Sequence, residues 1–500
     1  MSWWREGVLY QIYPRSFADS DGDGIGDLRG ITGRLDHLEW LGIDGIWLNP
    51  TMPSPNDDWG YDVADYCAVH ADLGTMEHLD ELIAEAGRRG IRVLLDLVPN
   101  HTSDRHAWFQ DALTGRDATH REHYVWADPG LGGEPPNNWQ SVFSGPAWTW
   151  HEPTGQFYLH NFLPSQPDLN WWNERVREDF DAILRFWFDR GVAGFRIDVC
   201  HAIVNDAELR DDPPATEDDH PHIQERGLRS AFSMNRPEVH DVLRRWRKVA
   251  NPDHILVGET YVLDLAELFP FYGQGEDELH MAFNFLFVHE DLHAGRMRTI
   301  VEAVEDGLPE ASWPVYTGSN HDAGRLATRW ADADEAKARC ALLMLLTLRG
   351  TPFLYYGDEL GLPDGDVPPD RRKDRVPDHR DGCRTPMPWT DEPAEDMWLP
   401  LTDTSRNVAG QREDRGSVLN FVRELIALRR RRADLHSGSY TTLPAPDGAW
   451  VWRRGEGTTV ALNLSDSPVT VDARGPVLIT TDGQDFDGVL APWSGVVLGA

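Results

Sequence analysis

The chain has 500 residues, of which 40% are hydrophobic, and a formal net charge of −36 at pH 7. This length suggests two to four domains with a sizeable core. The strong negative charge argues against nucleic acid as a partner, because phosphate groups would be repelled. No run of 18 apolar residues is present, so we expect no association with a membrane through a spanning segment.

Cysteine usage and the first residues indicate the compartment. The start, "MSWWREGVLY", lacks a basic region followed by an apolar stretch, so we expect no signal peptide. The cysteines are scattered without a CxxC pair, which indicates free thiols in a reducing cytoplasm and neither disulfides nor a zinc site. We therefore expect a cytoplasmic protein. The four cysteines are Cys67, Cys200, Cys340 and Cys383.

An acidic loop, "DSDGDGIGD", follows the first strand-like run of the chain. Carboxylates that lie this close repel one another unless a cation sits between them. An EF-hand is not supported, because position 12 of that template, counted from Asp19, is Gly30, and a strand precedes the loop. We predict a calcium- or magnesium-type site here, with a solvated acidic turn as the alternative. The predicted ligands are Asp19, Asp21, Asp23, Asp27 and the backbone carbonyl of Ile25.

Short strand-like runs alternate with amphipathic helical stretches through most of the chain. "MEHLDELIAEAGRRG" (Met76–Gly90) places its apolar residues on one face, and Glu174–Gly191 carries a similar apolar stripe. Eight strand–helix units predict an α/β fold, the (β/α)8 TIM barrel. The strand-like runs are Val8–Pro14, Gly45–Pro50, Arg92–Asn100, Gly194–Val199, His254–Thr260, Met281–Phe285, Val315–Asn320 and Thr351–Gly357.

Two segments interrupt this alternation, and the pattern changes near the end. Residues 102–170, rich in Pro, Gly, Asn and Trp, predict a small inserted domain after the third strand. Residues 358–410 predict a long loop over the barrel mouth. From residue 436, short alternating runs separated by turns predict a C-terminal antiparallel β domain, 436–500. The barrel itself then comprises residues 1–101 and 171–435.

Three carboxylates lie at the carboxyl ends of predicted strands, where barrels of this kind carry their working residues. They are Asp198 in "GFRIDV", Glu259 in "GET" and Asp322 in "SNHD". A carboxyl kept protonated among like charges is a ready general acid, and such a set suits glycoside hydrolysis. The alternative is that Asp198 and Glu259 form structural ion pairs. The residues that accompany them at these strand ends are His101, Arg196 and His321.

Motifs along essentially the whole chain carry a resemblance to a known family. They are "LYQIYPRSF" (Leu9–Phe17), "DLVPNH" (Asp96–His101), "GFRIDV" (Gly194–Val199), "GET" (Gly258–Thr260), "SNHD" (Ser319–Asp322) and "RTPMPW" (Arg384–Trp389). In this order they resemble the α-amylase family, glycoside hydrolase family 13. More narrowly, they are similar to its α-glucosidase and oligo-1,6-glucosidase group.

The resemblance implies roles for individual residues. Asp198 would be the nucleophile, Glu259 the acid/base and Asp322 the stabiliser of the transition state. A loop similar to Asp19–Asp27 holds one structural Ca²⁺ or Mg²⁺ ion in this group, and no organic cofactor is implied. The implied contacts to the glucose unit come from Asp62 in "GYDVADY", His101, Arg196, His321 and Arg384.

The same resemblance indicates a short α-linked oligosaccharide as substrate. Val199 after the nucleophile leans towards α-1,6 linkages, but Cys200 and His201 depart from that pattern, as does "HDAGR" (His321–Arg325). We therefore expect α-1,4 linkages to be slightly favoured, with transglucosylation as a side reaction. The alternatives are a sucrose-acting or isomerising transglucosidase and, more remotely, a non-catalytic scaffold. The sequence leaves the oligomeric state open.

Asp62 and Arg384 also predict how the site is closed. They belong to the loops after the second and eighth strands, which overhang the same mouth. We predict a bidentate ion pair between them that walls off the non-reducing side of the glucose site. A closed pocket admits only a chain end, so the enzyme would release one glucose at a time. The alternative is that each residue braces its own loop.

Overall fold

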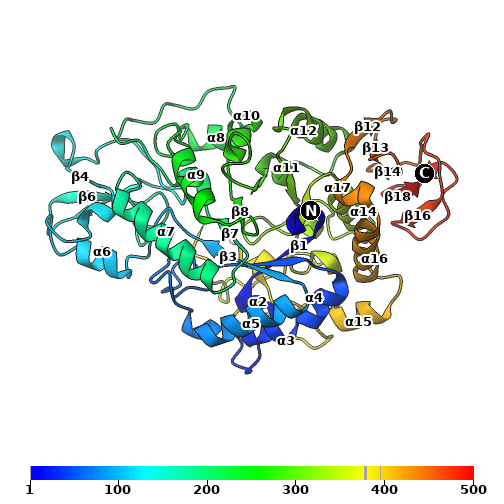
Figure 1. Cartoon of the computed structure of the whole chain (residues 1–500), viewed down its shortest axis with the longest axis horizontal. Coiled ribbons are helices and arrows are strands. Elements are labelled where there is room, and N and C mark those ends of the chain that lie inside the picture. Colours follow the sequence, from blue (N-terminus) through cyan, green and yellow to red (C-terminus); the bar gives the residue numbers. More distant parts are fainter. Residues whose placement is uncertain (1, 377–379, 395) are drawn as a thin grey trace.

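The computed structural model describes residues 2–376, 380–394 and 396–500 (Figure 1). Its centre is a parallel sheet of eight described strands in the order β10-β11-β1-β2-β3-β7-β8-β9. This confirms the predicted α/β barrel, and each of the eight predicted strands contains one observed strand. The strands are β1 (Leu9–Ile12), β2 (Gly45–Leu48), β3 (Arg92–Leu97), β7 (Gly194–Ile197), β8 (Ile255–Gly258), β9 (Met281–Ala282), β10 (Val315–Thr317) and β11 (Thr351–Tyr355).

Aromatic side chains close the barrel from within. The ring of Phe283, directly after β9, lies 5.0 Å from that of Phe353 on β11 and 6.0 Å from that of Trp47 on β2. These strands are far apart in the sheet order, so the sheet must curve until its ends meet. Leu94 of β3 and Val315 of β10 belong to the same buried cluster. The interior is therefore a packed core, as expected of a TIM barrel.

Amphipathic helices cover the outside of the barrel. In α5, Thr75 caps the N-terminus and Leu79, Leu82 and Ala86 are buried, and fully burying one leucine contributes about 1.5–3 kcal/mol. The helices are α1 (Trp3–Glu6), α2 (Pro14–Phe17), α3 (Leu28–Gly33), α4 (Leu35–Leu41), α5 (Met76–Arg88), α6 (Ala107–Ala112), α7 (Glu174–Asp189), α8 (Pro221–Arg226), α9 (Val239–Val249), α10 (Leu265–Leu268), α11 (Phe285–His289), α12 (Ala294–Gly307), α13 (Leu326–Arg329), α14 (Glu335–Thr347), α15 (Val408–Glu413), α16 (Val418–Arg431) and α17 (Ala433–Ser437).

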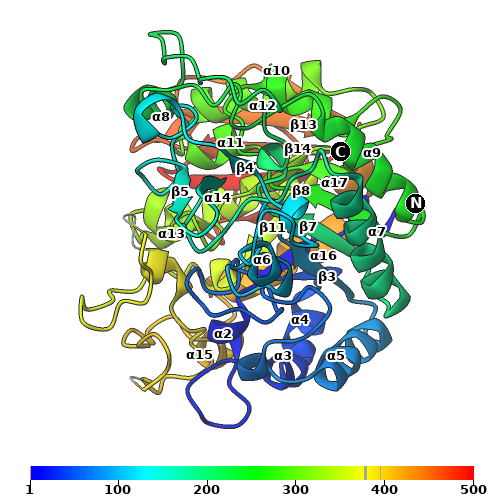
Figure 2. The same cartoon turned by 90° about the vertical axis from the view of Figure 1, so that its left-hand side faces the viewer.

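Antiparallel sheets lie at both ends of the molecule (Figure 1). The segment between β3 and α7, seen from its own side in Figure 2, holds the small sheet β4-β6-β5. Its strands are β4 (Trp126–Ala127), β5 (Trp148–His151) and β6 (Gln156–Leu159). This antiparallel sheet falls inside the predicted inserted domain, 102–170.

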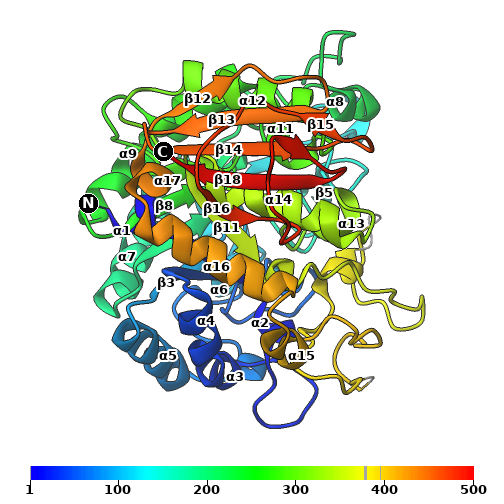
Figure 3. The same ribbon diagram turned by 90° about the vertical axis from the view of Figure 1, so that its right-hand side faces the viewer.

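The C-terminal strands form an antiparallel sheet beside α16 (Figure 3). Arg454 on β13 donates to the carbonyl of Thr347 at the end of α14 (2.6 Å), which fastens this sheet to the barrel. The strands are β12 (Tyr440–Leu443), β13 (Ala449–Arg454), β14 (Thr458–Asn463), β16 (Val477–Thr480) and β18 (Ser494–Gly499), with β15 (Val469–Thr470) pairing separately with β17 (Val489–Leu490).

The segment after β11 covers the loop expected at 358–410, and α15 begins within it; the extent of that loop stays a prediction. Parts of that expected loop, 377–379 and 395, lie outside the described residues. The described part contains a short 3-10 helix, Arg380–Arg384, which reaches the carboxyl ends of the barrel strands. Among the described helices, none combines the length and apolar character that crossing a membrane requires.

Candidate active site

A cavity of about 700 Å³ opens at the carboxyl ends of the barrel strands. Asp198 follows β7, Glu259 follows β8 and Asp322 follows β10, and all three line this cavity, as does His101 after β3. The structure therefore brings the three predicted catalytic carboxylates into one site. The inserted segment supplies part of the wall through Val142, Phe143 and Phe162.

Arg196 lies behind the cavity and holds two of these carboxylates. One of its terminal nitrogens is 2.6 Å from Asp198 Oδ1, and the other is 2.6 Å from Glu259 Oε2. The same guanidinium is 2.8 Å from buried Asp96. One cation thus faces three acidic groups. Burial raises the pKa of Asp198 above its usual range, Arg196 opposes the rise, and the neighbouring Glu259 and Asp96 add to it.

The charge balance of this cluster has a chemical consequence. Three carboxylates around one guanidinium cannot all remain ionised at low cost in a buried site. Burial likewise raises the pKa of Asp96 to about 6. The cluster therefore favours keeping a proton, which belongs to the interacting groups together rather than to one of them. A retained proton beside an ionised carboxylate is what acid-assisted displacement at a sugar carbon requires.

Val199 positions Glu259 through the backbone. It has φ 34° and ψ 45°, a left-handed conformation that β-branched residues rarely adopt. In this conformation its N–H donates to Glu259 Oε2 at 2.9 Å. The strained residue thus directs a fixed donor at the predicted acid/base, and strain of this kind gathers at functional sites.

Asp322 is held by two of the predicted residues, His321 and Arg384, and by Arg380, which was not predicted. Arg380 and Arg384 contact its Oδ1 at 2.6 Å and 3.0 Å, and His321 Nε2 lies 3.1 Å from its Oδ2. Gln11 lies 2.9 Å from the other ring nitrogen of His321. Burial lowers the pKa of His321, so the ring is neutral. Burial alone would raise the pKa of Asp322, but His321 and the guanidinium groups of Arg380 and Arg384 hold it below its usual range, and Asp322 stays ionised.

The predicted ion pair between Asp62 and Arg384 is wrong. The Asp62 carboxylate accepts from Ser54 Oγ (2.6 Å) and from the N–H groups of Asp57 (2.8 Å) and Asp58 (3.2 Å). These bonds turn it back into its own loop, and it does not line the cavity. Burial raises its pKa to about 6. Arg384 is likewise engaged elsewhere, through its donation to the carbonyl of His321 at 2.8 Å.

A different pair joins the two loops. Arg380 donates to Asp58 Oδ1 at 2.8 Å, and both residues line the cavity. A third carboxylate, Asp374, accepts from the Arg380 Nε at 2.9 Å and fixes the plane of the guanidinium. Gln166 of the inserted segment donates to the other oxygen of Asp58 at 3.1 Å. The loops after β2 and β11 are therefore tied across the barrel mouth by Asp58 and Arg380. Each of these residues lies four positions before its predicted counterpart, Asp62 or Arg384.

Sequence reasoning missed the outer wall of the cavity, which comes from the segment between β7 and β8. The interval between these strands is much longer than one helix needs, and this was the available signal. The residues from this segment and from the loop after β8 that line the cavity include Arg226, Met234, Arg236 and Tyr261. Of the predicted residues, Arg196, His321 and Arg384 stand behind the cavity and orient those that line it.

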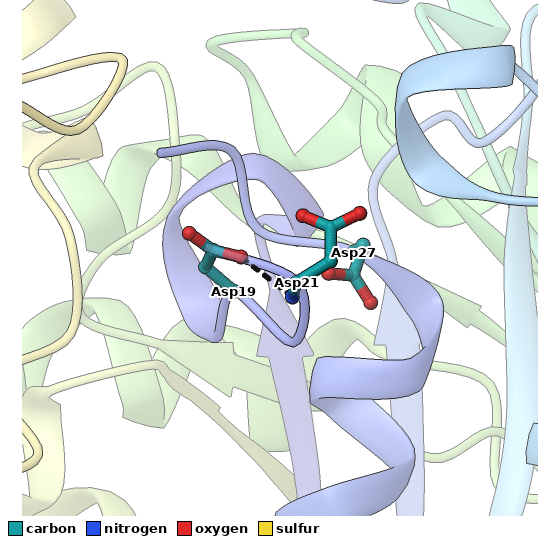
Figure 4. A group of neighbouring side chains, drawn as sticks. All are labelled: Asp19, Asp21 and Asp27. Carbon is teal, nitrogen blue, oxygen red and sulfur yellow. Dashed lines mark hydrogen bonds between the residues drawn. The ribbon is translucent and has the colours of Figure 1, made fainter. Parts of the chain in front are cut away.

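The acidic loop lies between α2 and α3, away from this cavity. Asp19, Asp21 and Asp27 each offer an oxygen within 4.8 Å of the others (Figure 4). Carboxylate oxygens at this spacing fit a hard cation such as Ca²⁺ or Mg²⁺. Asp23 is not in this group; its carboxylate accepts from the N–H of Ile25 at 2.8 Å. The ligand set with Asp23 and the Ile25 carbonyl stays a prediction.

Comparisons with known proteins agree with this architecture. The alpha-amylase catalytic-domain family matches residues 11–438. A probable alpha-glucosidase of Rhizobium meliloti is 39% identical over 97% of this chain and 93% of its own length. An oligo-1,6-glucosidase of Heyndrickxia coagulans is 36% identical over 94% and 93%. The solved structure of an alpha-glucosyl transfer enzyme has a TM-score of 0.93 at 38% identity and covers all of both chains.

Proposed function

The chain belongs to the alpha-amylase family and is a glycoside hydrolase of the alpha-glucosidase kind, and from this premise we propose that it removes single glucose units from the non-reducing ends of short α-glucosides. The observation that carries this proposal is the tie between Asp58 and Arg380 (2.8 Å). It joins the loops after β2 and β11 across the barrel mouth beside Asp322. A polymer could not run through a site crossed by this pair, whereas a chain end can enter it.

The geometry supports a two-step retaining mechanism. Asp198 attacks the anomeric carbon while Glu259 gives its proton to the departing glycosidic oxygen, and a covalent β-glucosyl-enzyme forms. Glu259 then takes a proton from water, which displaces Asp198 and releases α-glucose. Arg196 lies 2.6 Å from both carboxylates and holds them at a fixed distance from each other through the two steps. Ionised Asp322, with Arg380, supplies charge-assisted hydrogen bonds to the hydroxyls of the bound glucose.

The substrates follow from this pocket and from the relatives. We propose short oligosaccharides, with α-1,4 linkages slightly favoured over α-1,6, because Cys200 and His201 follow Val199. A second sugar arriving before water would give transglucosylation. The cavity extends past Glu259 to Tyr261 and Met234 and so leaves room for such an acceptor. A relative named for alpha-glucosyl transfer supports this as a side reaction.

We also propose one structural Ca²⁺ or Mg²⁺ ion in the loop at 19–27, with ligands from Asp19, Asp21 and Asp27. No residue of this loop lines the catalytic cavity, so the ion would act on the stability of the loop alone. The proposed chemistry requires no organic cofactor. All four cysteines are free thiols and three are buried, which supports a cytoplasmic location.

The test compares initial rates on maltose, maltotriose and soluble starch at equal weight, with the viscosity of the starch followed. The proposal predicts fast glucose release from the short substrates and an almost constant viscosity. A rapid fall in viscosity before much glucose appears would mean internal cleavage. The anomeric form of the first product, followed by NMR on maltose, tests retention, for which α-glucose is expected.

A further inference from the structure

A second cavity, of about 370 Å³, lies on the inserted segment and shares no lining residue with the catalytic cavity. One side is formed by Trp126 on β4 and Gln156 on β6. The other side is formed by Asn205 and the residues after it, which follow β7, and by Trp172 just before α7. The cavity therefore lies between the inserted segment and the barrel, and its volume falls within the range of small-molecule sites.

The charges around this cavity balance. Arg116 and Arg121 line it, and so do Glu122 and Asp206. Arg121 is buried, donates to Gln156 Oε1 at 2.7 Å, and lies 3.2 Å above the ring of Trp126. Two cationic and two anionic side chains give no net attraction for an ion of either sign. The cavity thus fits an uncharged ligand with many hydrogen-bonding groups.

Two polar groups of the lining lack partners among the described residues. Asn205 is only 4% exposed, yet its side-chain amide forms no hydrogen bond there. The indole N–H of Trp126 is buried and has no acceptor within the described chain. Buried polar groups in folded proteins are nearly always hydrogen bonded. The indole N–H of Trp126 is sealed from the cavity, whereas the amide of Asn205 lies on its lining and is the group that a ligand in the cavity can reach.

Trp172 supplies an aromatic face at the same place. Its side chain is 42% exposed, although most large aromatic residues of this protein are buried. Its indole N–H donates to the carbonyl of Asn205 at 2.9 Å, which fixes the orientation of the ring. A fixed, half-exposed indole beside an unpaired amide offers both an apolar surface and hydrogen bonds. Pyranose rings need both, because their C–H faces are apolar and their edges carry hydroxyls.

We propose that this cavity is a second, non-catalytic saccharide site that holds one pyranose unit of a neutral oligosaccharide against Trp172. Asn205 donates to and accepts from the hydroxyls of that unit. The choice of α-glucosides as the ligand rests on the proposed function of the catalytic site. The site would hold substrate or product at the surface of the inserted segment without taking part in bond cleavage.

The test counts bound maltose by equilibrium dialysis with radiolabelled maltose on the inactive Asp198→Asn enzyme. Two maltose molecules per chain are expected at saturation. Adding Trp172→Ala should remove one of them, and adding Asn205→Ala should weaken the second site at least tenfold. Trp150→Ala is the matched control, because Trp150 is 41% exposed on β5 and does not line the cavity. It should leave both sites intact.

The outcomes separate this proposal from the catalytic one. If Trp172→Ala leaves the stoichiometry of the Asp198→Asn enzyme unchanged, the second site is refuted. If one site is present and Trp172→Ala abolishes it, the catalytic site has failed while this proposal holds. In the active enzyme, Trp172→Ala should keep kcat on p-nitrophenyl α-glucoside within about twofold. That result, with an unchanged melting temperature, shows that the variant folds.

Discussion

Replacing Asp58 by Asn tests the tie that closes the catalytic site. The carboxylate is 5% exposed and bridges Arg380 (2.8 Å) and Gln166 (3.1 Å). Asparagine keeps the shape but removes the charge, so the bond from Arg380 is no longer between opposite charges. A hydrogen bond between charged groups contributes about 1.5–3 kcal/mol. If the bond is needed in the transition state, kcat/KM should fall by about tenfold to 150-fold.

Asp62→Asn provides the matched comparison, because Asp62 lies on the same loop and is fully buried but does not line the cavity. Its carboxylate accepts three hydrogen bonds within the loop. An amide oxygen can keep only part of them, so we expect a loss of about 1–2 kcal/mol in stability. The fall in kcat/KM at 25 °C should be smaller than for Asp58→Asn.

The assay is kcat/KM on maltose at 25 °C, with urea unfolding of each variant and the starch viscosity test. Asp58→Asn should lower kcat/KM as well as the urea midpoint, and the ratio of starch cleavage to maltose cleavage should rise. Asp62→Asn should lower the urea midpoint with a smaller loss of kcat/KM and should leave that ratio unchanged. If Asp62→Asn loses more activity than Asp58→Asn while both remain folded, the position of the tie has been misassigned.

Three further predictions concern the parts around this tie. Removing divalent ions with EDTA should lower the melting temperature, because the carboxylates at 19–27 then repel one another, and should leave kcat at 25 °C nearly unchanged; an unchanged melting temperature would count against a bound ion. Val199→Gly removes the penalty of φ 34°, about 1–3 kcal/mol, at an entropic cost of about 0.5–1 kcal/mol. The urea midpoint should rise while kcat falls, because glycine keeps the N–H that donates to Glu259 but holds it less firmly in place; a fall in stability would show that no strain was stored. Burial lowers the pKa of His201 to about 4, below its value of about 6.5 in the unfolded chain. The contribution of His201 to the free energy of unfolding is therefore fully present above pH 6.5. This contribution is lost as the pH falls from 6.5 to 4. The urea midpoint should drop less between pH 7 and 5 in His201→Gln than in the native enzyme, and equal drops would contradict the assignment.

The barrel could be predicted because its strands are read from short-range pattern. Runs such as Arg92–Asn100 and Thr351–Gly357 are apolar enough to be buried on both faces, and each contains an observed strand. The catalytic carboxylates followed from the same pattern. Asp198 and Glu259 sit directly after β7 and β8, and Asp322 lies in the loop that follows β10, so their position along the chain brings them to the carboxyl ends of the strands.

The partners of loop residues could not be predicted in this way. Asp58 and Asp62 are both aspartates of one loop, and only the turn between them decides which reaches Arg380. Trp59 in that turn has φ 49°, a left-handed conformation that no local sequence pattern predicts for tryptophan. Arg380 and Arg384 pose the same problem on the other loop. Both contact Asp322, but only the spacing imposed by the 3-10 helix brings Arg380 to Asp58.

The outer wall of the catalytic cavity could not be predicted from the sequence for a related reason. The segment between β7 and β8 contributes Met234 and Arg236 to the cavity through irregular backbone rather than a regular element. Such residues have no period of two or 3.6 to reveal which of them face inward. The exposed ring of Trp172 was equally hidden, because tryptophan in a sequence is more often part of a core.

The most direct test of the central claim is to trap the glucosyl-enzyme on Asp198. In Glu259→Gln, α-glucosyl fluoride can still react, because fluoride leaves without a proton, but water cannot be activated to release the product. Peptide mass spectrometry of the quenched enzyme should then show one glucosyl group on the peptide that carries Asp198. A glucosyl group on another residue, or no covalent adduct while fluoride is released in a burst, would contradict the proposed mechanism.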